Sequence, residues 1–354
     1  MTSRERMEAV LRGGRPDRIP FVPSIYEHGA AVIGVTPSEA SQDPGLMARA
    51  AIESFRRYGH DLITVGIDIY NIEAEAFGCP VRRFTDSSIP AIEGHPLGDT
   101  ELLDSSSLAI PREASSNRLG LIVEACRTAM REVGQETVVY ACMGGPFSQA
   151  VELRGFDRLV ADMLETPEAV HALLEKTTTL SIAHALHLSE TGVGVNIYES
   201  WATLPLISPA IFRDFVVPYE KRIVRAVREK HSTPGPAVIM GGDTSALIDF
   251  FIETGTSLVV ADYMTDFTFM RTRLAAAGSS MVIRGCLDPK KIGRGDWAGL
   301  AEPIQALARK ARGLDAYAWG CGCVPLTTPR ENVLRFKKLC LAADPGAVDP
   351  TDRG

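Results

Sequence analysis

The stretch Leu62-Ile-Thr-Val-Gly-Ile67, followed at once by Asp68, shows the pattern that decides the fold, because the same pattern recurs along the chain. Each such run is short and apolar and ends beside a polar or catalytically capable residue or a glycine turn. Helix-period sequence follows the runs, which predicts parallel βα units and a single α/β domain, a (β/α)8 TIM barrel. The eight runs are Ile19–Ser24, Leu62–Ile67, Thr137–Ala141, Gly194–Ile197, Ala237–Met240, Leu258–Val260, Met281–Arg284 and Ala316–Trp319.

Two segments outside the repeated pattern are expected to cover the ends of the barrel. Residues 2–12 have helical spacing with Ser3 as the expected N-cap, and they predict an N-terminal helical lid over the barrel floor. Residues 79–112, after the second strand, are rich in Ser, Pro, Asp and Gly and predict an excursion over the active-site face. We expect the barrel domain to span residues 1–345 and residues 346–354 to form a flexible tail.

The composition of the 354 residues is that of a globular protein with a large core, at 45% hydrophobic and 23% charged residues. No apolar run approaches the roughly 20 residues that span a bilayer, and the N-terminus has no apolar signal core, so we expect a cytoplasmic protein. A net charge of −7 without a basic run argues against nucleic-acid binding. Seven scattered cysteines favour free thiols over disulfides.

Six segments, in order over nearly the whole chain, resemble the uroporphyrinogen decarboxylase superfamily, in particular its branch of methylcobalamin-dependent methyltransferases. The resemblance implies the same barrel that the strand pattern predicts. The segments are Gly14–Pro20, Ile72–Cys79, Gly144–Phe147 with Leu153–Gly155, Leu206–Pro209, Gly242–Thr244, and Gly320–Pro325 with Thr328–Asn332.

The decarboxylases of this superfamily hold the carboxylates of a tetrapyrrole with arginines after the first strand, since the guanidinium presents a bidentate fork. The matching segment here, Pro23–Gly29, contains no arginine. Glu152 stands where the decarboxylases have a tyrosine, and Cys321 stands where they have a histidine. Asp68, which matches the aspartate that binds the pyrrole nitrogens, is retained. Porphyrinogen decarboxylation is therefore disfavoured.

The methyltransferase branch carries a zinc site with a His-x-Cys pair and a later cysteine, and the metal activates a thiol substrate. Cys321 matches the third ligand, whereas Ile239 and Gly241 stand where the His-x-Cys pair should be. Cys321 and Cys323 alternate on an extended segment and should point to opposite sides. We favour Cys321 as a metal ligand because the resemblance places it in the pocket. Zinc or another divalent metal, and a metal-free acid–base site, both stay open.

The residues that follow the predicted strands are the candidates for catalysis, because the carboxyl ends of barrel strands converge. His28 titrates near neutrality, and Asp68 and Glu199 end apolar strands, so we predict that these three are catalytic. Alternatively, His28 binds a helix end and Asp68 caps a turn. The predicted substrate-binding residues are Tyr26, Glu73, Glu152, Trp201, Asp243 and Arg284, with helix-dipole and capping roles as the alternatives for Glu152 and Asp243.

The favoured function is a corrinoid-linked methyltransferase that moves a methyl group between a small O- or N-methylated substrate and cobalamin. The corrinoid would arrive on a partner protein or free, because the chain has no segment that resembles a cobalamin-binding domain. The alternative enzyme is a decarboxylase or lyase of a carboxylated substrate, small or tetrapyrrole, for which Arg284 at a strand end is the most interesting basic residue. A corrinoid or tetrapyrrole carrier protein is a third hypothesis, disfavoured by the many ionisable groups at strand ends. Barrel helices often pair, so a homodimer is a candidate assembly.

Overall fold

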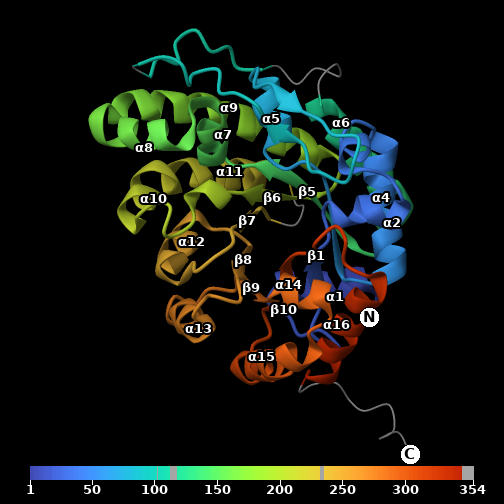
Figure 1. Ribbon diagram of the computed structural model, residues 1–354. Helices are drawn as coiled ribbons and strands as arrows, with labels where there is room; N and C mark the ends of the chain where they lie inside the picture. Colours follow the sequence, from blue (N-terminus) through green and yellow to red (C-terminus); the bar gives the residue numbers. More distant parts are fainter. Residues whose placement is uncertain (102, 112–117, 232–234, 345–354) are drawn as a thin grey trace, which may run out of the picture.

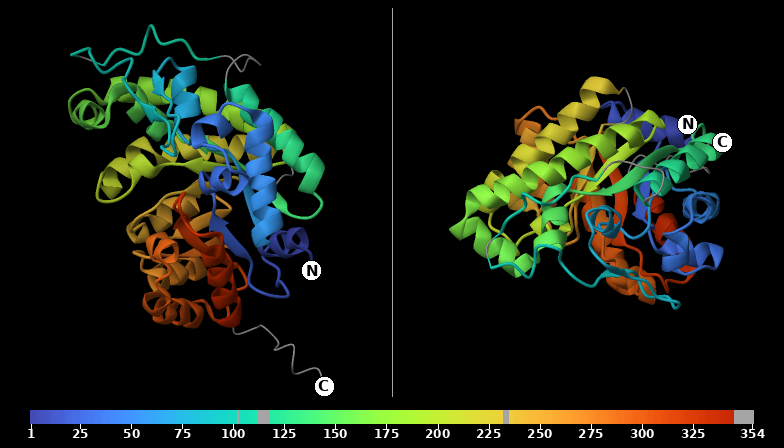
Figure 2. Two further views of the ribbon diagram at one scale, coloured as in Figure 1. Left: turned by 45° about the vertical axis from the view of Figure 1, so that its right-hand side comes forward. Right: turned by 90° about the horizontal axis from the view of Figure 1, so that it is seen from above.

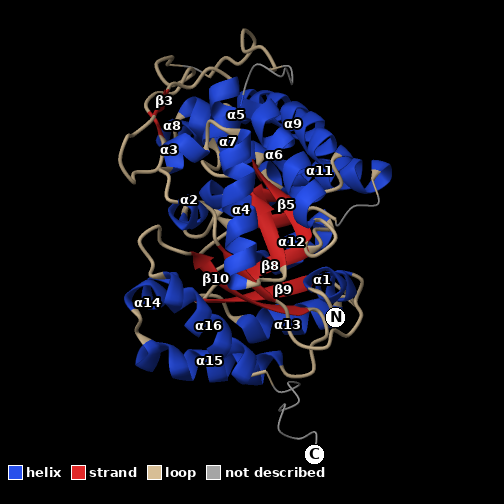
Figure 3. Ribbon diagram, turned by 90° about the vertical axis from the view of Figure 1, so that its right-hand side faces the viewer, coloured by secondary structure: helices blue, strands red, loops and turns tan. Residues whose placement is uncertain are grey.

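The structure, a computed structural model, describes residues 1–101, 103–111, 118–231 and 235–344, and the expected tail at 346–354 lies outside them. Parallel strands form the centre and helices surround them (Figures 1 and 3). Each of the eight predicted runs contains or overlaps a strand, so the α/β barrel prediction is confirmed. The strands are β1 (Phe21–Ser24), β2 (Leu62–Val65), β5 (Val138–Gly144), β6 (Gly194–Tyr198), β7 (Ala237–Ile239), β8 (Leu258–Ala261), β9 (Val282–Leu287) and β10 (Tyr317–Cys323).

The strands follow one another in the order of a barrel, but their hydrogen-bonded ladders form two halves. One half has the order β2-β5-β6-β7 and the other β1-β10-β9-β8, and every neighbouring pair within them is parallel. At the junction of β1 with β2, Asp61 N donates to Phe21 O at 2.8 Å. At the junction of β7 with β8, Ser257 N donates to Pro236 O at 2.9 Å. Side-chain hydrogen bonds add to these links, from Phe21 N to Asp61 Oδ2 at the first junction and from Val238 N to Thr256 Oγ1 at the second.

Local sequence signals set the helix boundaries. In α4, Asp43 caps the N-terminus through Leu46 N at 2.8 Å, Pro44 begins the helix, and Gly59 ends it in the left-handed region at φ 57°. The helices are α1 (Ser3–Leu11), α2 (His28–Ile33), α3 (Pro37–Ala40), α4 (Pro44–Tyr58), α5 (Asn71–Ala76), α6 (Arg118–Val133), α7 (Pro146–Arg154), α8 (Phe156–Glu165), α9 (Pro167–Glu190), α10 (Pro209–Phe215), α11 (Val217–Lys230), α12 (Ile248–Thr254), α13 (Phe267–Ala276), α14 (Pro289–Arg294), α15 (Trp297–Ala311) and α16 (Arg330–Ala342), with 3-10 turns at Ser200–Ala202 and Ser245–Leu247.

The N-terminal helix α1 covers the barrel floor, as predicted. Met7 and Val10 are fully buried and pack in one cluster with residues from the amino ends of the strands, such as Leu62 and Val138. The predicted cap was wrong by one residue. Thr2, and not Ser3, is the N-cap, because its hydroxyl accepts from Glu5 N at 3.1 Å while Thr2 N donates to the Glu5 carboxylate at 2.8 Å.

The excursion after β2 forms a short antiparallel hairpin of β3 (Val81–Arg82) and β4 (Ala91–Ile92). It runs across one end of the molecule near α8 (Figures 1 and 2). Its second part is fixed to α7, since Leu97 N donates to Leu153 O at 2.9 Å and the Arg154 guanidinium donates to Thr100 O at 2.8 Å. None of the helices in the described part of the chain is long and apolar enough to cross a membrane.

Candidate functional site

The inner face of the barrel becomes polar toward the carboxyl ends of the strands. Tyr26 follows β1, Tyr198 ends β6, and the Tyr198 hydroxyl donates to the Tyr26 hydroxyl at 2.6 Å, with the two rings edge to face. Arg284 and Cys286 lie on the inner face of β9. Arg284 interacts electrostatically with Cys286 and with both tyrosines. Burial raises the pKa of the Cys286 thiol to about 11, although the nearby guanidinium acts to lower it. We refer to Tyr26, Tyr198, Arg284 and Cys286 as the inner cluster.

Arg284 fits on the inner face because the neighbouring strand carries only small residues beside it, Ala318 and Gly320. In the register of β9 and β10, Arg284 is paired with Ala318 and Cys286 with Gly320, and a Cβ atom at Gly320 would lie 2.7 Å from Arg284 Cγ and 3.0 Å from Cys286 Sγ. Such distances are too short for real Cβ atoms. The glycine therefore leaves the space that the arginine stem occupies.

Glu27 and Cys323 lie at the mouth of the barrel beside the inner cluster. Burial raises the pKa of the Glu27 carboxyl, although backbone amides of Glu27 and Asp68 donate to it and act to lower the pKa. Cys323, the last residue of β10, is exposed to solvent, but protein atoms surround its thiol closely enough to desolvate it. This enclosure, together with the negative charge of Glu27, raises the pKa of the Cys323 thiol to about 12. Glu27 is thus an acid whose proton is held to higher pH than usual.

His28, predicted to be catalytic, is the first residue of α2 and is 1% exposed. Its Nε2 lies 2.8 Å from the Tyr58 hydroxyl of α4, and its Nδ1 lies 3.3 Å from Leu326 O in the loop after β10. Burial lowers the pKa of His28, so the ring is neutral near pH 7. The imidazole therefore connects α2, α4 and this loop. This role is close to the alternative in which His28 binds a helix end, because Tyr58 is the last residue of α4.

Asp68, predicted to be catalytic or to bind pyrrole nitrogens, is 1% exposed and has a left-handed φ of 71°. Its carboxylate oxygens accept from Asn71 Nδ2 and Arg118 Nη1. Burial raises the pKa of Asp68, and the charge of Arg118 opposes that shift. Because both oxygens are bonded within the protein, a substrate would have to displace Arg118 or Asn71 to reach them.

Glu199, the third predicted catalytic residue, is fully buried under the N-terminus of α7. Its carboxylate accepts from Phe147 N at 3.0 Å, Ser148 N at 2.8 Å and Ser148 Oγ at 2.6 Å. Glu220 of α11 lies beside it and is also buried. Burial and the neighbouring charge of Glu199 raise the pKa of Glu220 well above its usual value.

The predicted substrate-binding acids have varied surroundings. Buried Glu73 accepts from Gly144 N at 2.9 Å and fixes the end of β5. Glu152 accepts from Trp201 Nε1 at 2.8 Å, and the Trp201 ring stacks on Phe156 at a centroid distance of 5.6 Å.

Asp243 is exposed, and its carboxylate accepts from Ser245 N at 3.0 Å. It therefore fixes the start of the 3-10 turn at Ser245–Leu247 from the position before the N-cap, Thr244, a role close to the capping alternative. The acids at the strand ends mostly fix turns and helix starts.

Cys321, predicted to be a metal ligand, is fully buried and belongs to the cluster between the strands and the outer helices, with Phe336 and Cys340 of α16. Cys323, not Cys321, reaches the barrel mouth. The register between β1 and β10 shifts at this point, since Pro23 pairs with Cys321 and Ser24 with Cys323. In the described residues, no group of three or more His, Cys, Asp or Glu side chains could hold a metal ion. The residues present thus do not fit the zinc site of the methyltransferase branch.

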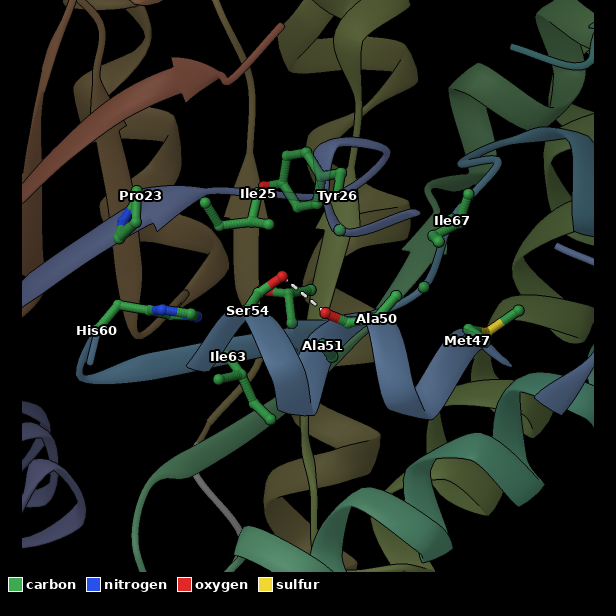
Figure 4. Close-up of a pocket in the computed structure, with 13 residues that line it drawn as sticks. Pro23, Ile25, Tyr26, Met47, Ala50, Ala51, Ser54, His60, Ile63 and Ile67 are labelled. Atoms are coloured by element: carbon green, nitrogen blue, oxygen red, sulfur yellow. Dashed lines mark hydrogen bonds between the residues drawn. The ribbon is translucent and has the colours of Figure 1, made fainter. Parts of the chain in front are cut away.

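Three cavities or hollows can be described, and Arg284 lines none of them. A cavity of about 10 Å³ between α4, β1 and β2 has space for about one water molecule (Figure 4). Tyr26 is one of the residues that line it, and most of the others are apolar, such as Met47 and Ile63. Hollows of about 410 Å³ near Arg18 and about 620 Å³ near His95 lie at the barrel floor and beside the excursion.

Sequence reasoning found Tyr26 and Arg284 but did not select Glu27, Tyr198 or Cys323. The expected reason for separating Cys321 from Cys323 was wrong, because residues two apart on a regular strand share a face. The register shift beside Pro23 and Ser24 interrupts the regular pattern between the two cysteines. Glu27 stands between two predicted site residues, so its position at the strand end was the available signal.

Comparisons with known proteins place nearly the whole chain in one family. Residues 2–341 match the family model described as uroporphyrinogen decarboxylase (URO-D). The chain is 28% identical over 344 residues to a methylcobamide:CoM methyltransferase, MtbA, of Methanosarcina acetivorans, covering 95% of this chain and 96% of the relative. It is 31% identical over 221 residues to uroporphyrinogen decarboxylase 2, chloroplastic, of Arabidopsis thaliana, covering 60% and 54%. A solved methyltransferase from Methanosarcina mazei has the same fold, with a TM-score of 0.80, 22% identity and coverage of 97% and 98%.

Proposed function

Because the chain belongs to the uroporphyrinogen decarboxylase family, we propose that it is a corrinoid-linked methyltransferase within that family, acting on a small O- or N-methylated compound. The observation that carries the proposal is the similarity to a methylcobamide:CoM methyltransferase over 95% of this chain and 96% of the relative. The proposed enzyme is one catalytic domain over residues 1–345 that works in the cytoplasm.

The surroundings of Asp68 support methyl transfer over porphyrinogen decarboxylation. A decarboxylase would need this carboxylate free to accept from pyrrole nitrogens, whereas here it accepts from Arg118 and Asn71. The segment Pro23–Gly29 also has no arginine to bind the propionates of a tetrapyrrole. Both features reduce the capacity of the site to bind a polycarboxylated tetrapyrrole.

The corrinoid, supplied on a partner protein or free, would provide the cobalt centre that exchanges the methyl group. The chain's own contribution is to bind the methylated compound at the strand ends and to handle the proton of the leaving group. A methoxy oxygen or an amine leaves readily only when it is protonated. Glu27 is suited to donate that proton, since burial raises its pKa and its neighbours Cys323 and Cys142 are uncharged at neutral pH. We derive no step through zinc, because the ligand set is absent from the described residues.

The test is a methyl-transfer assay with the purified full-length protein. Reduced cobalamin and a panel of methoxylated and N-methylated compounds are mixed with the protein, and formation of methylcobalamin is followed by visible absorption. Transfer above the rate without protein supports the proposal. No transfer across the panel, combined with decarboxylation of a porphyrinogen, would replace it with the lyase alternative. Size-exclusion chromatography of the same sample would show whether two copies pair.

A further inference from the structure

Four arginines in the described part of the chain are less than 9% exposed, and one of them differs from the others. Three donate to carboxylates within the protein. Arg284 is 5% exposed, yet it forms no ion pair with any described residue, and its Nε atom has no hydrogen-bond partner there. The three paired arginines are Arg6 with Asp61 at 2.7 Å, Arg118 with Asp68, and Arg154 with Asp162 at 2.7 Å.

An unpaired buried guanidinium is unfavourable. Arginine stays protonated in proteins, so it cannot lose its charge as a buried lysine can. Taking such a charge out of water is strongly unfavourable unless an anion compensates it. The folded chain nevertheless accommodates Arg284, because Gly320 leaves the space for its stem. A position that is built for a charge but supplies no counter-ion is expected to receive the counter-ion from a ligand.

The groups around Arg284 are neutral. The nearest titratable neighbours are the hydroxyls of Tyr26 and Tyr198 and the thiols of Cys286 and Cys321, and burial raises the pKa of each of them. They therefore carry no negative charge near pH 7. Tyr26 and Tyr198 belong to the carboxyl ends of β1 and β6, so the guanidinium lies on the side of the barrel where substrates bind. The guanidinium therefore has no anion among these four neighbours.

We propose that Arg284 binds the carboxylate of the methylated substrate, so that the enzyme acts on small methylated carboxylic acids. This inference rests on the proposed function and names the substrate class of that same site. The planar guanidinium can donate two parallel hydrogen bonds to a carboxylate, and the hydroxyl pair of Tyr26 and Tyr198 lies beside it to complete the contact. Arg284 would hold one end of the substrate while Glu27 protonates the leaving atom at the other.

The test measures binding without any corrinoid, by calorimetry and thermal shift, using methoxyacetate and its uncharged counterpart 2-methoxyethanol. We expect the wild-type protein to bind methoxyacetate at least tenfold more tightly than 2-methoxyethanol. Arg284→Met should abolish this preference, and Arg284→Lys should restore only part of it because lysine lacks the fork. Arg273→Met, which changes an exposed arginine on α13 paired with Asp249, is the matched control and should bind as the wild type does.

Stability separates a ligand-binding role from a structural one. Without ligand, Arg284→Met should melt at the same temperature as the wild type or higher, since it removes an uncompensated charge and keeps an apolar stem. Gly320→Ala, which retains the charge but obstructs its stem, should also weaken methoxyacetate binding. A large decrease in the melting temperature of Arg284→Met, or an equal affinity of wild type and Arg284→Met for methoxyacetate, would overturn the inference. If the preference for methoxyacetate depends on Arg284 but no methyl transfer occurs, the anion site stands and the proposed reaction fails.

Discussion

Replacing Glu199 by alanine distinguishes a catalytic carboxylate from one that holds the fold together. The wild-type side chain accepts hydrogen bonds from Phe147 N, Ser148 N and Ser148 Oγ, all buried. The serine hydroxyl can rotate to another acceptor, but the two backbone amides are fixed at the start of α7. Each amide left without a partner costs about 1–3 kcal/mol, so Glu199→Ala should lose about 2–6 kcal/mol of stability.

Thermal unfolding followed by circular dichroism at a fixed protein concentration measures this loss. For a chain of this length we expect the midpoint to fall by roughly 3–8 °C. Glu253→Ala is the control, because Glu253 is about half exposed and pairs only with exposed Lys221, and it should stay within about 0.5 kcal/mol of the wild type. A Glu199→Ala protein that melts like the wild type but has lost methyl transfer would refute the structural reasoning and restore Glu199 as a catalytic residue.

Three further predictions concern the buried charges. The pKa of Glu220 is raised in the fold, so its contribution to stability is fully present below the ordinary glutamate pKa and is lost as the pH rises. Glu220→Gln should therefore flatten the fall of the melting temperature between pH 5 and 9. Parallel melting curves of the variant and the wild type over this range would contradict the prediction. Arg118→Met should destabilise by about 3–5 kcal/mol because Asp68 is left as an unpaired buried charge, and adding Asp68→Asn should recover part of the loss in thermal unfolding. Glu27→Gln should slow methyl transfer by about 10²–10⁴-fold with the melting temperature nearly unchanged, whereas an unchanged rate would exclude Glu27 as the proton donor.

The barrel could be predicted from the sequence because its signals are local. Each strand is a short apolar run, and prolines and glycines mark where the helices begin and end, as at Pro44 and Gly59. The N-cap of α1 was misplaced by one residue, since Thr2 and Ser3 have the same chemistry and only the Glu5 partner decides between them. Boundaries of this kind depend on geometry within a single turn.

The site was predicted less completely because it depends on contacts between distant segments. The strand-end positions of His28, Asp68 and Glu199 were foreseen, but their partners come from α4, α6 and α7. The orientation of the cysteines in β10 could not be foreseen either. A parallel barrel strand is buried on both faces, so both faces are apolar and the sequence carries little information on which faces inward. The observed register decides in favour of Cys323.

The distribution of acids at the strand ends explains why Arg284 and Glu27 are the most informative residues of the site. Asp68, Glu73 and Glu199 each accept hydrogen bonds from an arginine or from backbone amides near β5 and α7, so their charges are already compensated within the fold. In the part of the chain that the structure describes, no side chain donates a hydrogen bond to Glu27, and no carboxylate pairs with Arg284. An acid with a raised pKa and a cation without a counter-ion thus lie within the same group of strand ends. This arrangement favours a substrate that brings a negative charge at one end and a basic leaving atom at the other.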